Sequence, residues 1–194
     1  MWYNSFIAQR CCRRLRRSLK SAGTQGHVQA RRRMRRAFLF GPVPRRAAER
    51  KGNAGDMTRR EAREQAFCLV FEQAVGGEAI QDILHDAAEA RDFVPNSYAE
   101  AAAFGVEEHR EEIDQVIQGN IRGWSFSRLS KVTLALLRLA VYEMLFDESI
   151  PASVSINEAV ELAKTYGGKD DAPYINGVLA SVAKAHCSDE PGHE

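Results

Sequence analysis

The stretch Val132-Thr-Leu-Ala-Leu-Leu-Arg-Leu-Ala-Val-Tyr-Glu-Met-Leu-Phe146 decides the fold of this chain. Only Arg138 and Glu143 are charged within it. A surface helix has one apolar stripe, but this segment is apolar almost all round, which indicates a helix packed on several sides. It is too short for a membrane span, which needs roughly 20 apolar residues. We therefore predict a buried central helix in an all-helical domain.

From residue 57 onward, the flanking sequence also follows the helical repeat. Capping-box spacings, in which Ser or Thr precedes Glu by three positions, begin at Thr58, Ser97 and Ser155. Gly76-Gly77 and Gly167-Gly168 have the composition of helix stops. No alternating strand pattern recurs, so we predict a compact bundle of about six or seven helices.

A long acidic helix is predicted from Ser97 to about Gln118. Its core candidates are Phe104, Ile113, Val116 and Ile117, and its carboxylates are those of Glu107, Glu108, Glu111, Glu112 and Asp114. Paired carboxylates can perform acid–base chemistry. Because no neighbouring sequence feature would raise their pKa or bind a metal, we interpret these side chains as a solvated face.

The charge of the chain is divided between two regions. Residues 1–56 carry 15 Lys and Arg against two acidic residues, whereas the remaining residues carry 12 basic and 24 acidic side chains. We predict that residues 1–56 are a basic disordered extension. Three interpretations stay open: sequence upstream of a true start at Met57, an arm that binds nucleic acid nonspecifically, or an organelle transit peptide.

Cysteine and histidine usage gives no sign of a metal site or an active site. Cys11, Cys12, Cys68 and Cys187 have neither zinc-site nor disulfide-framework spacing, and Cys68, among apolar neighbours, is predicted to be a small core residue. This usage fits a reducing, cytoplasmic location. No glycine-rich phosphate loop and no nucleophile–base set is present. We predict no enzyme activity, no cofactor and no metal.

A small basic cluster stands out in the acidic part of the chain. Arg59, Arg60 and Arg63 lie at the start of the first predicted helix, and offsets of three and four place Arg63 beside both others. The arginine fork binds phosphate bidentately and stacks on bases. The alternative is that these arginines only pair with Glu61, Glu64 or the acidic helix.

Several segments, in order and at fitting intervals, resemble the NusB family. They are Thr58-Arg-Arg-Glu-Ala-Arg-Glu-Gln-Ala, Leu136-Leu-Arg-Leu-Ala-Val-Tyr-Glu-Met, Ile150-Pro, Ser155-Ile-Asn-Glu-Ala-Val-Glu-Leu-Ala-Lys-Thr-Tyr-Gly and Tyr174-Ile-Asn-Gly-Val-Leu. The resemblance covers about Met57 to Ala185, and the last two segments together are highly specific. It implies a NusB-like helical RNA-binding domain over residues 57–187, in two small subdomains, followed by a frayed tail at 188–194.

The resemblance also implies a function. NusB-family proteins are transcription antitermination factors that bind the boxA element of ribosomal RNA leaders together with a small-subunit ribosomal protein acting as NusE. The complex joins the RNA polymerase elongation complex. No catalysis, cofactor or membrane is involved, and the location is cytoplasmic.

Site residues follow from the resemblance position by position. The three arginines match the family's RNA-binding N-terminal segment, and Asp170 and Tyr174 match a loop and helix start that lie against RNA. Tyr174 can stack on a base, or it is a half-buried bundle aromatic. Phe71 falls where the family often has an aromatic side chain, and we assign it to partner binding. We interpret four further matching residues as capping and close helix packing, not RNA contact: Asn157, Glu158, Asn176 and Gly177.

Two departures from the family pattern weaken the positive field. Glu61 stands within the arginine segment, and Ala172-Pro173 lacks the charge that some relatives carry near Tyr174. With few arginines, the log–log salt slope should be shallow, about −0.7 per phosphate on single strands. The ribosomal protein would then complete the binding surface.

Two other functions remain open at this point. The first is a helical protein–protein module, or homodimer, without specific RNA binding. The second is the NusB-like domain of a ribosomal RNA cytosine methyltransferase. Since the sequence ends at Glu194, we expect no room for a catalytic domain.

Overall fold

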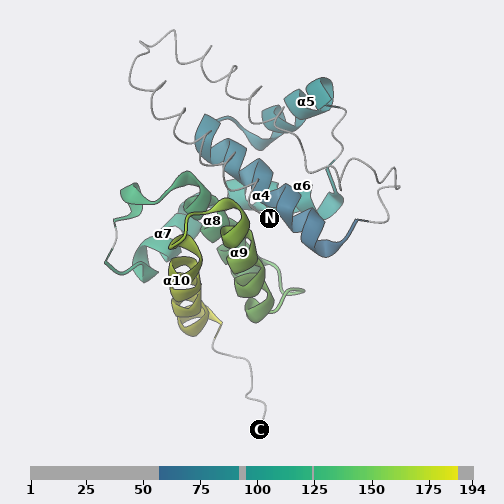
Figure 1. Cartoon of the computed structure of the whole chain (residues 1–194). Helices are drawn as coiled ribbons and strands as arrows, with labels where there is room; N and C mark the ends of the chain where they lie inside the picture. The colour runs from purple at the N-terminus through teal and green to yellow at the C-terminus, as the bar shows by residue number, and fades with distance from the viewer. Residues whose placement is uncertain (1–56, 92–94, 124, 188–194) are drawn as a thin grey trace, which may run out of the picture. The chain divides into compact units, whose positions relative to one another are not determined.

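The structure is a computed structural model, and it describes residues 57–91, 95–123 and 125–187 (Figure 1). Over these ranges the elements are α4 (Arg59–Gly76), α5 (Ile80–Arg91), α6 (Ser97–Glu108), α7 (Arg110–Asn120), a 3-10 turn η1 (Phe126–Arg128), α8 (Lys131–Phe146), α9 (Ala152–Tyr166) and α10 (Asp171–His186). The described ranges hold seven α-helices and no strand, which confirms the all-helical prediction. The predictions for residues 1–56 and for the tail at 188–194 lie outside the described residues.

Helix α8 is the centre of the fold. Every residue from Thr133 to Val141 is buried. The helix packs against α4, α6, α7, α9 and α10 (Figure 1). Removing so much apolar surface from water supplies the main driving force for folding. Two helix groups meet on it: α4 packs with α5 and α6, while α10 packs with α9 and α7.

The ends of α4 form as the sequence predicts. The Thr58 hydroxyl accepts a hydrogen bond from the backbone N–H of Glu61, and the Glu61 carboxylate accepts one from the backbone N–H of Thr58 at 2.9 Å. At the other end, Gly77 has a φ of 76°, a left-handed conformation that glycine adopts without strain. The first capping box and the glycine stop are confirmed.

The other two capping boxes are wrong. The cap of α6 is Asn96, whose side chain accepts from the backbone N–H of Tyr98, so Ser97 is already helical. Helix α9 begins at Ala152 after Pro151, and Ser155 lies a turn inside it with 1% of its surface exposed. Asparagine caps a helix as well as serine does, so α6 begins one residue earlier than predicted. Proline has a φ that suits the start of a helix, so α9 begins directly after Pro151, ahead of Ser155.

The long acidic helix is divided at His109 into α6 and α7. Ile113 and Ile117 are fully buried as predicted, but Phe104 is 36% exposed. The buried face of α6 consists of small residues, Ala99, Ala102, Ala103 and Val106 among them, and this leaves Phe104 on the outer face. Cys68 is also exposed, because it lies on the outer face of α4 although its neighbours in sequence are apolar.

Two of the acidic side chains hold helices together instead of forming a solvated face. Glu107 accepts hydrogen bonds from the backbone N–H of Ile80 at 3.2 and 3.3 Å and from Gln73 Nε2 at 2.6 Å. It therefore caps the N-terminus of α5 from α6. Asp114 accepts two hydrogen bonds of 2.7 Å from the guanidinium of Arg138, which fastens α7 to α8.

No helix within the described part of the chain is long and apolar enough to cross a membrane.

We predict that Glu107→Ala destabilises the domain by about 1–3 kcal/mol, because the buried Gln73 amide and the first N–H of α5 lose their acceptor. Urea unfolding measures the loss, and hydrogen exchange should show it first in α5. The control is Glu108→Ala, an exposed neighbour that should change stability by less than about 0.5 kcal/mol. Equal effects of the two substitutions would contradict the capping role.

Candidate nucleic-acid interface

Arg59 and Arg60 are exposed on the first turn of α4. The Arg60 guanidinium lies 3.8 Å from the Glu161 carboxylate of α9, and 58% of the Arg60 side chain remains exposed. An ion pair this open to solvent is held weakly. Both arginines are therefore free to meet a phosphate, as the sequence analysis expects.

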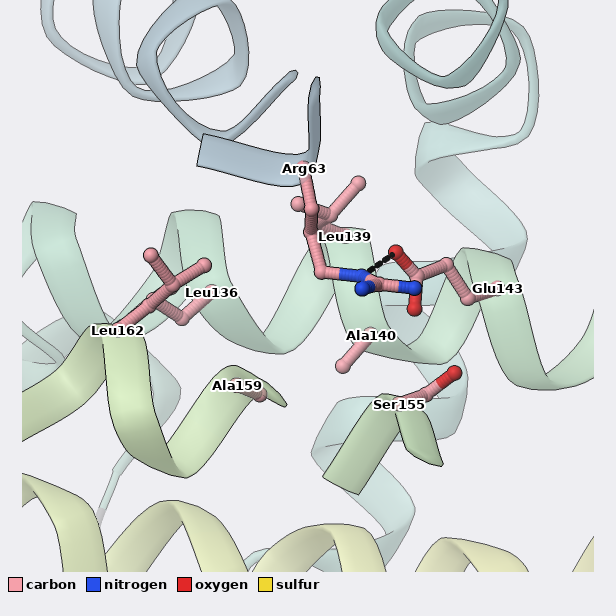
Figure 2. A pocket seen from close by; sticks show the side chains of 8 residues that line it. All are labelled: Arg63, Leu136, Leu139, Ala140, Glu143, Ser155, Ala159 and Leu162. Carbon is pink, nitrogen blue, oxygen red and sulfur yellow. Dashed lines mark hydrogen bonds and ion pairs between the residues drawn. The ribbon is translucent and has the colours of Figure 1, made fainter. Parts of the chain in front are cut away.

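Arg63 does not share their surface. It is 6% exposed, and its Nε donates a hydrogen bond of 2.7 Å to Glu143 Oε1 on α8. Figure 2 shows the Arg63 side chain extending from its helix toward Glu143. Its Nη1 lies 3.8 Å from Glu158 Oε2 on α9, and its guanidinium carbon lies 5.9 Å from the centre of the Tyr98 ring on α6. The expected exposed cluster of three arginines is thus a pair, with the third facing inward.

The position of Arg63 follows from the inward stripe of α4. Ala66, Val70 and Gln73 follow at helical spacing, and all are buried. An offset of three or four residues limits the angle between side chains on a helix but does not say which of them faces the core. The resemblance to Arg-rich relatives gave no information on this point either.

Protonation in this cluster is set by burial and by Glu143. Burial disfavours the Arg63 cation, but the hydrogen bond and charge of Glu143 outweigh this and raise the pKa of Arg63. Burial, followed by the charge and hydrogen bond of Glu143, raises the pKa of the Tyr98 phenol. Tyr98 therefore stays a neutral donor, and its hydroxyl donates to Glu143 Oε1 at 2.5 Å.

The second group of predicted site residues lies where α10 begins. Asp170 is exposed at the N-cap of α10, and its side chain makes no capping hydrogen bond. The preceding turn is tight: a Cβ on Gly167 would lie 2.6 Å from the carbonyl oxygen of Ala163. The Asp171 carboxylate accepts from the backbone N–H of Gly168 at 2.5 Å. These contacts give the loop a fixed shape.

Tyr174 is half-buried against the core, and burial raises the pKa of its phenol. Part of the Tyr174 side chain therefore packs within the helical bundle, as one of the two interpretations predicts. The remaining surface is open to a ligand. Stacking on a base stays a prediction.

Helix α9 links the arginine pair to this loop. At its C-terminal end, the Tyr166 hydroxyl donates to the Glu64 carboxylate of α4, and the Tyr166 ring centre lies 5.1 Å from that of Phe67. Burial and this hydrogen bond raise the pKa of Tyr166. The chain then passes directly from Tyr166 into the loop. Contacts with α4 therefore determine where the loop starts.

Two lysines that the sequence pattern did not single out also lie near these residues. Lys164 Nζ donates to Glu161 Oε1 at 2.6 Å, and that hydrogen bond lowers the pKa of Glu161. Because Glu161 also lies beside Arg60, the two cations share one carboxylate. Lys169 is exposed in the loop next to Asp170. Their position on both sides of the Gly167-Gly168 stop was a usable signal.

Other residues assigned through the resemblance lie elsewhere. Phe71 is half-buried, and its ring stacks on Phe67 with centres 5.9 Å apart, so only part of it can meet a partner. Asn176 and Gly177 are exposed within α10, and a Cβ on Gly177 would meet nothing within 4 Å. The interpretation of these two residues as capping and close packing is therefore wrong.

Comparison with known proteins gives consistent matches. Residues 60–184 match the model of the NusB family. The transcription antitermination protein NusB of Clostridium botulinum (strain Kyoto / Type A2) is 41% identical over 142 residues, which span 65% of this chain and 99% of that protein. NusB of Acetivibrio thermocellus is 40% identical over 140 residues, 71% of this chain and 97% of that protein.

Solved structures agree with the sequence matches. A structure of T. maritima NusB superposes with a TM-score of 0.61 at 34% identity, covering 69% of this chain and 96% of that chain. A crystal structure of the antitermination factors NusB and NusE in complex with dsRNA gives a TM-score of 0.59 at 28% identity, covering 66% of this chain and 97% of that chain. The family match spans most of the chain, and relatives align over nearly their whole length; this chain therefore belongs to the NusB family of transcription antitermination factors, which are not enzymes.

Proposed function

We propose that this chain binds boxA RNA of ribosomal RNA leaders, together with a small-subunit ribosomal protein acting as NusE, within the cytoplasmic RNA polymerase elongation complex. The observation that carries the proposal is the exposed pair Arg59 and Arg60 in a domain that is otherwise strongly acidic. We include Lys164, Lys169, Asp170 and Tyr174 in the same interface, because Lys164 shares Glu161 with Arg60 and α9 leads directly into the loop before α10. The solved complex of a NusB with NusE and dsRNA supports both classes of partner.

The charge distribution suggests why a protein partner is needed. Two exposed arginines neutralise few phosphates, so RNA affinity alone should be modest and the salt slope shallow. From residue 57 onward, the chain carries 12 basic against 24 acidic side chains, which favours association with a basic ribosomal protein. We assign the exposed part of Phe71 to that contact.

The direct test is fluorescence anisotropy of labelled boxA RNA titrated with the full chain, with scrambled RNA as the control. Measurements are made at physiological salt with and without the small-subunit ribosomal protein. We expect preferential boxA binding that strengthens with the partner. Equal, weak binding to both RNAs under all conditions would leave a helical protein–protein module or homodimer, and sedimentation would then identify self-association.

We predict that replacing Arg59 and Arg60 together by Gln weakens boxA binding about tenfold, a change of about 1.4 kcal/mol. The log–log salt slope should become shallower by roughly 0.7 for each phosphate contact that is lost. The matched control replaces Arg110 and Arg122 together by Gln, which removes two exposed arginines from α7 and the segment after it. A loss of the same size in the control would mean that only net charge matters.

We predict the opposite effect for Glu161→Gln. The Glu161 carboxylate lies between Arg60 and Lys164, where it competes with a phosphate for both cations. Its neutralisation should tighten RNA binding by roughly threefold and steepen the salt slope. Glu148→Gln removes an exposed carboxylate away from these cations and serves as the control. Weaker binding of the Glu161 variant would place RNA elsewhere on the domain.

A further inference from the structure

We propose that Arg63 is a positioning residue that does not contact RNA: with Glu143 and Tyr98 it holds the first turns of α4 so that Arg59 and Arg60 are presented in a fixed arrangement. This inference rests on the proposed function. It assigns the three arginines of the Arg-rich segment two different tasks. It also adds two residues far from that segment to the determinants of RNA affinity.

The geometry joins four helices at one guanidinium. Arg63 on α4 donates to Glu143 on α8 at 2.7 Å, and Tyr98 on α6 donates to the same carboxylate oxygen at 2.5 Å. Glu158 on α9 lies 3.8 Å from the guanidinium. Because a guanidinium is planar and rigid, these partners limit both the rotation of α4 about its axis and its movement along that axis.

The cluster is dry. Ser155 of α9 and the apolar side chains of Leu136, Leu139 and Leu162 line one pocket with Arg63 and Glu143 (Figure 2), and its free space is too narrow for a water molecule. Glu143 is 1% exposed, and its Oε2 has no hydrogen-bond partner among the described residues. If Arg63 turned outward to reach a phosphate, it would leave a buried carboxylate without its counter-ion. Direct contact between Arg63 and RNA is therefore strongly disfavoured.

Rotation of α4 would change where its exposed arginines meet RNA. Because an arginine side chain is long, a small rotation of the helix displaces the guanidinium group at its end. Arg59 and Arg60 lie one turn from Arg63 on the same helix, so a small rotation of α4 at Arg63 moves both guanidinium groups. A surface held in its bound arrangement loses less entropy on binding than one that must be ordered. The buried pair thus raises affinity without touching the ligand.

The test is Glu143→Gln, because the two roles of Arg63 predict opposite signs. A direct RNA contact would be strengthened by releasing the Arg63 cation from its carboxylate, which would tighten binding and steepen the salt slope. A positioning role predicts binding weakened by about fivefold, since coupling across such a contact is typically worth a few-fold to a hundredfold. Anisotropy with boxA and scrambled RNA measures affinity, slope and preference.

Two further variants separate positioning from general loss of stability. Tyr98→Phe removes one hydrogen bond to Glu143 without changing charge, and it should weaken binding in the same direction but less. Asp114→Asn weakens the other arginine–carboxylate pair, which is partly buried between α7 and α8, and should leave RNA affinity unchanged. Circular dichroism and thermal unfolding confirm that each variant is folded at the temperature of the titration.

Each outcome decides the inference. Weaker binding by the Glu143 and Tyr98 variants, with the Asp114 variant unchanged, supports positioning. Tighter binding by Glu143→Gln, or no change, overturns it, and so does an equal loss in all three variants. If the wild-type chain shows no preference for boxA RNA, the proposed function fails and the inference fails with it.

Discussion

The structure depends on the burial of α8 on all sides, and the two charges within that helix are the points at which other helices are fastened to it. Glu143 accepts a hydrogen bond from Arg63 of α4, and Arg138 donates hydrogen bonds to Asp114 of α7. The hydrophobic effect has no preferred direction, whereas the hydrogen bonds of a bidentate or shared carboxylate require a defined geometry. The apolar surface of α8 therefore supplies stability, and its two charges specify how α4 and α7 are oriented on it.

The helical repeat was sufficient to predict the all-helical class, the central helix and the glycine stop after α4. It was insufficient wherever a side chain acts between helices. Glu107 appeared to belong to a solvated acidic face, because nothing in the sequence connects it with the start of α5, 27 residues away. Arg63 appeared to be a surface arginine for the same reason: its partner Glu143 is 80 residues away. Cys68 has apolar neighbours in sequence but lies on the outward side of its helix.

In the candidate site, too, the sequence indicates individual residues but not the contacts between helices. Sequence resemblance predicts an RNA-binding role for Arg59, Arg60, Asp170 and Tyr174, whose side chains the structure leaves wholly or partly exposed. Resemblance alone does not distinguish an exposed arginine such as Arg59 from a buried one such as Arg63. Lys164 was missed because its relation to Arg60 passes through Glu161 on a different helix. Only the three-dimensional arrangement brings these charges together.

Exposed and buried arginines differ in how much free energy is needed to break their ion pairs. Arg60 can exchange its weak contact with Glu161 for a phosphate at little cost, because water screens the pair it leaves, and Arg59 is likewise exposed. Arg63 cannot make that exchange, because its carboxylate has no access to water. An RNA surface with few mobile cations gains affinity chiefly by holding them in place and by sharing the RNA with a basic partner. If the chain binds RNA as we propose, the buried ion pair beneath α4 meets the first requirement and the acidic exterior of the domain meets the second.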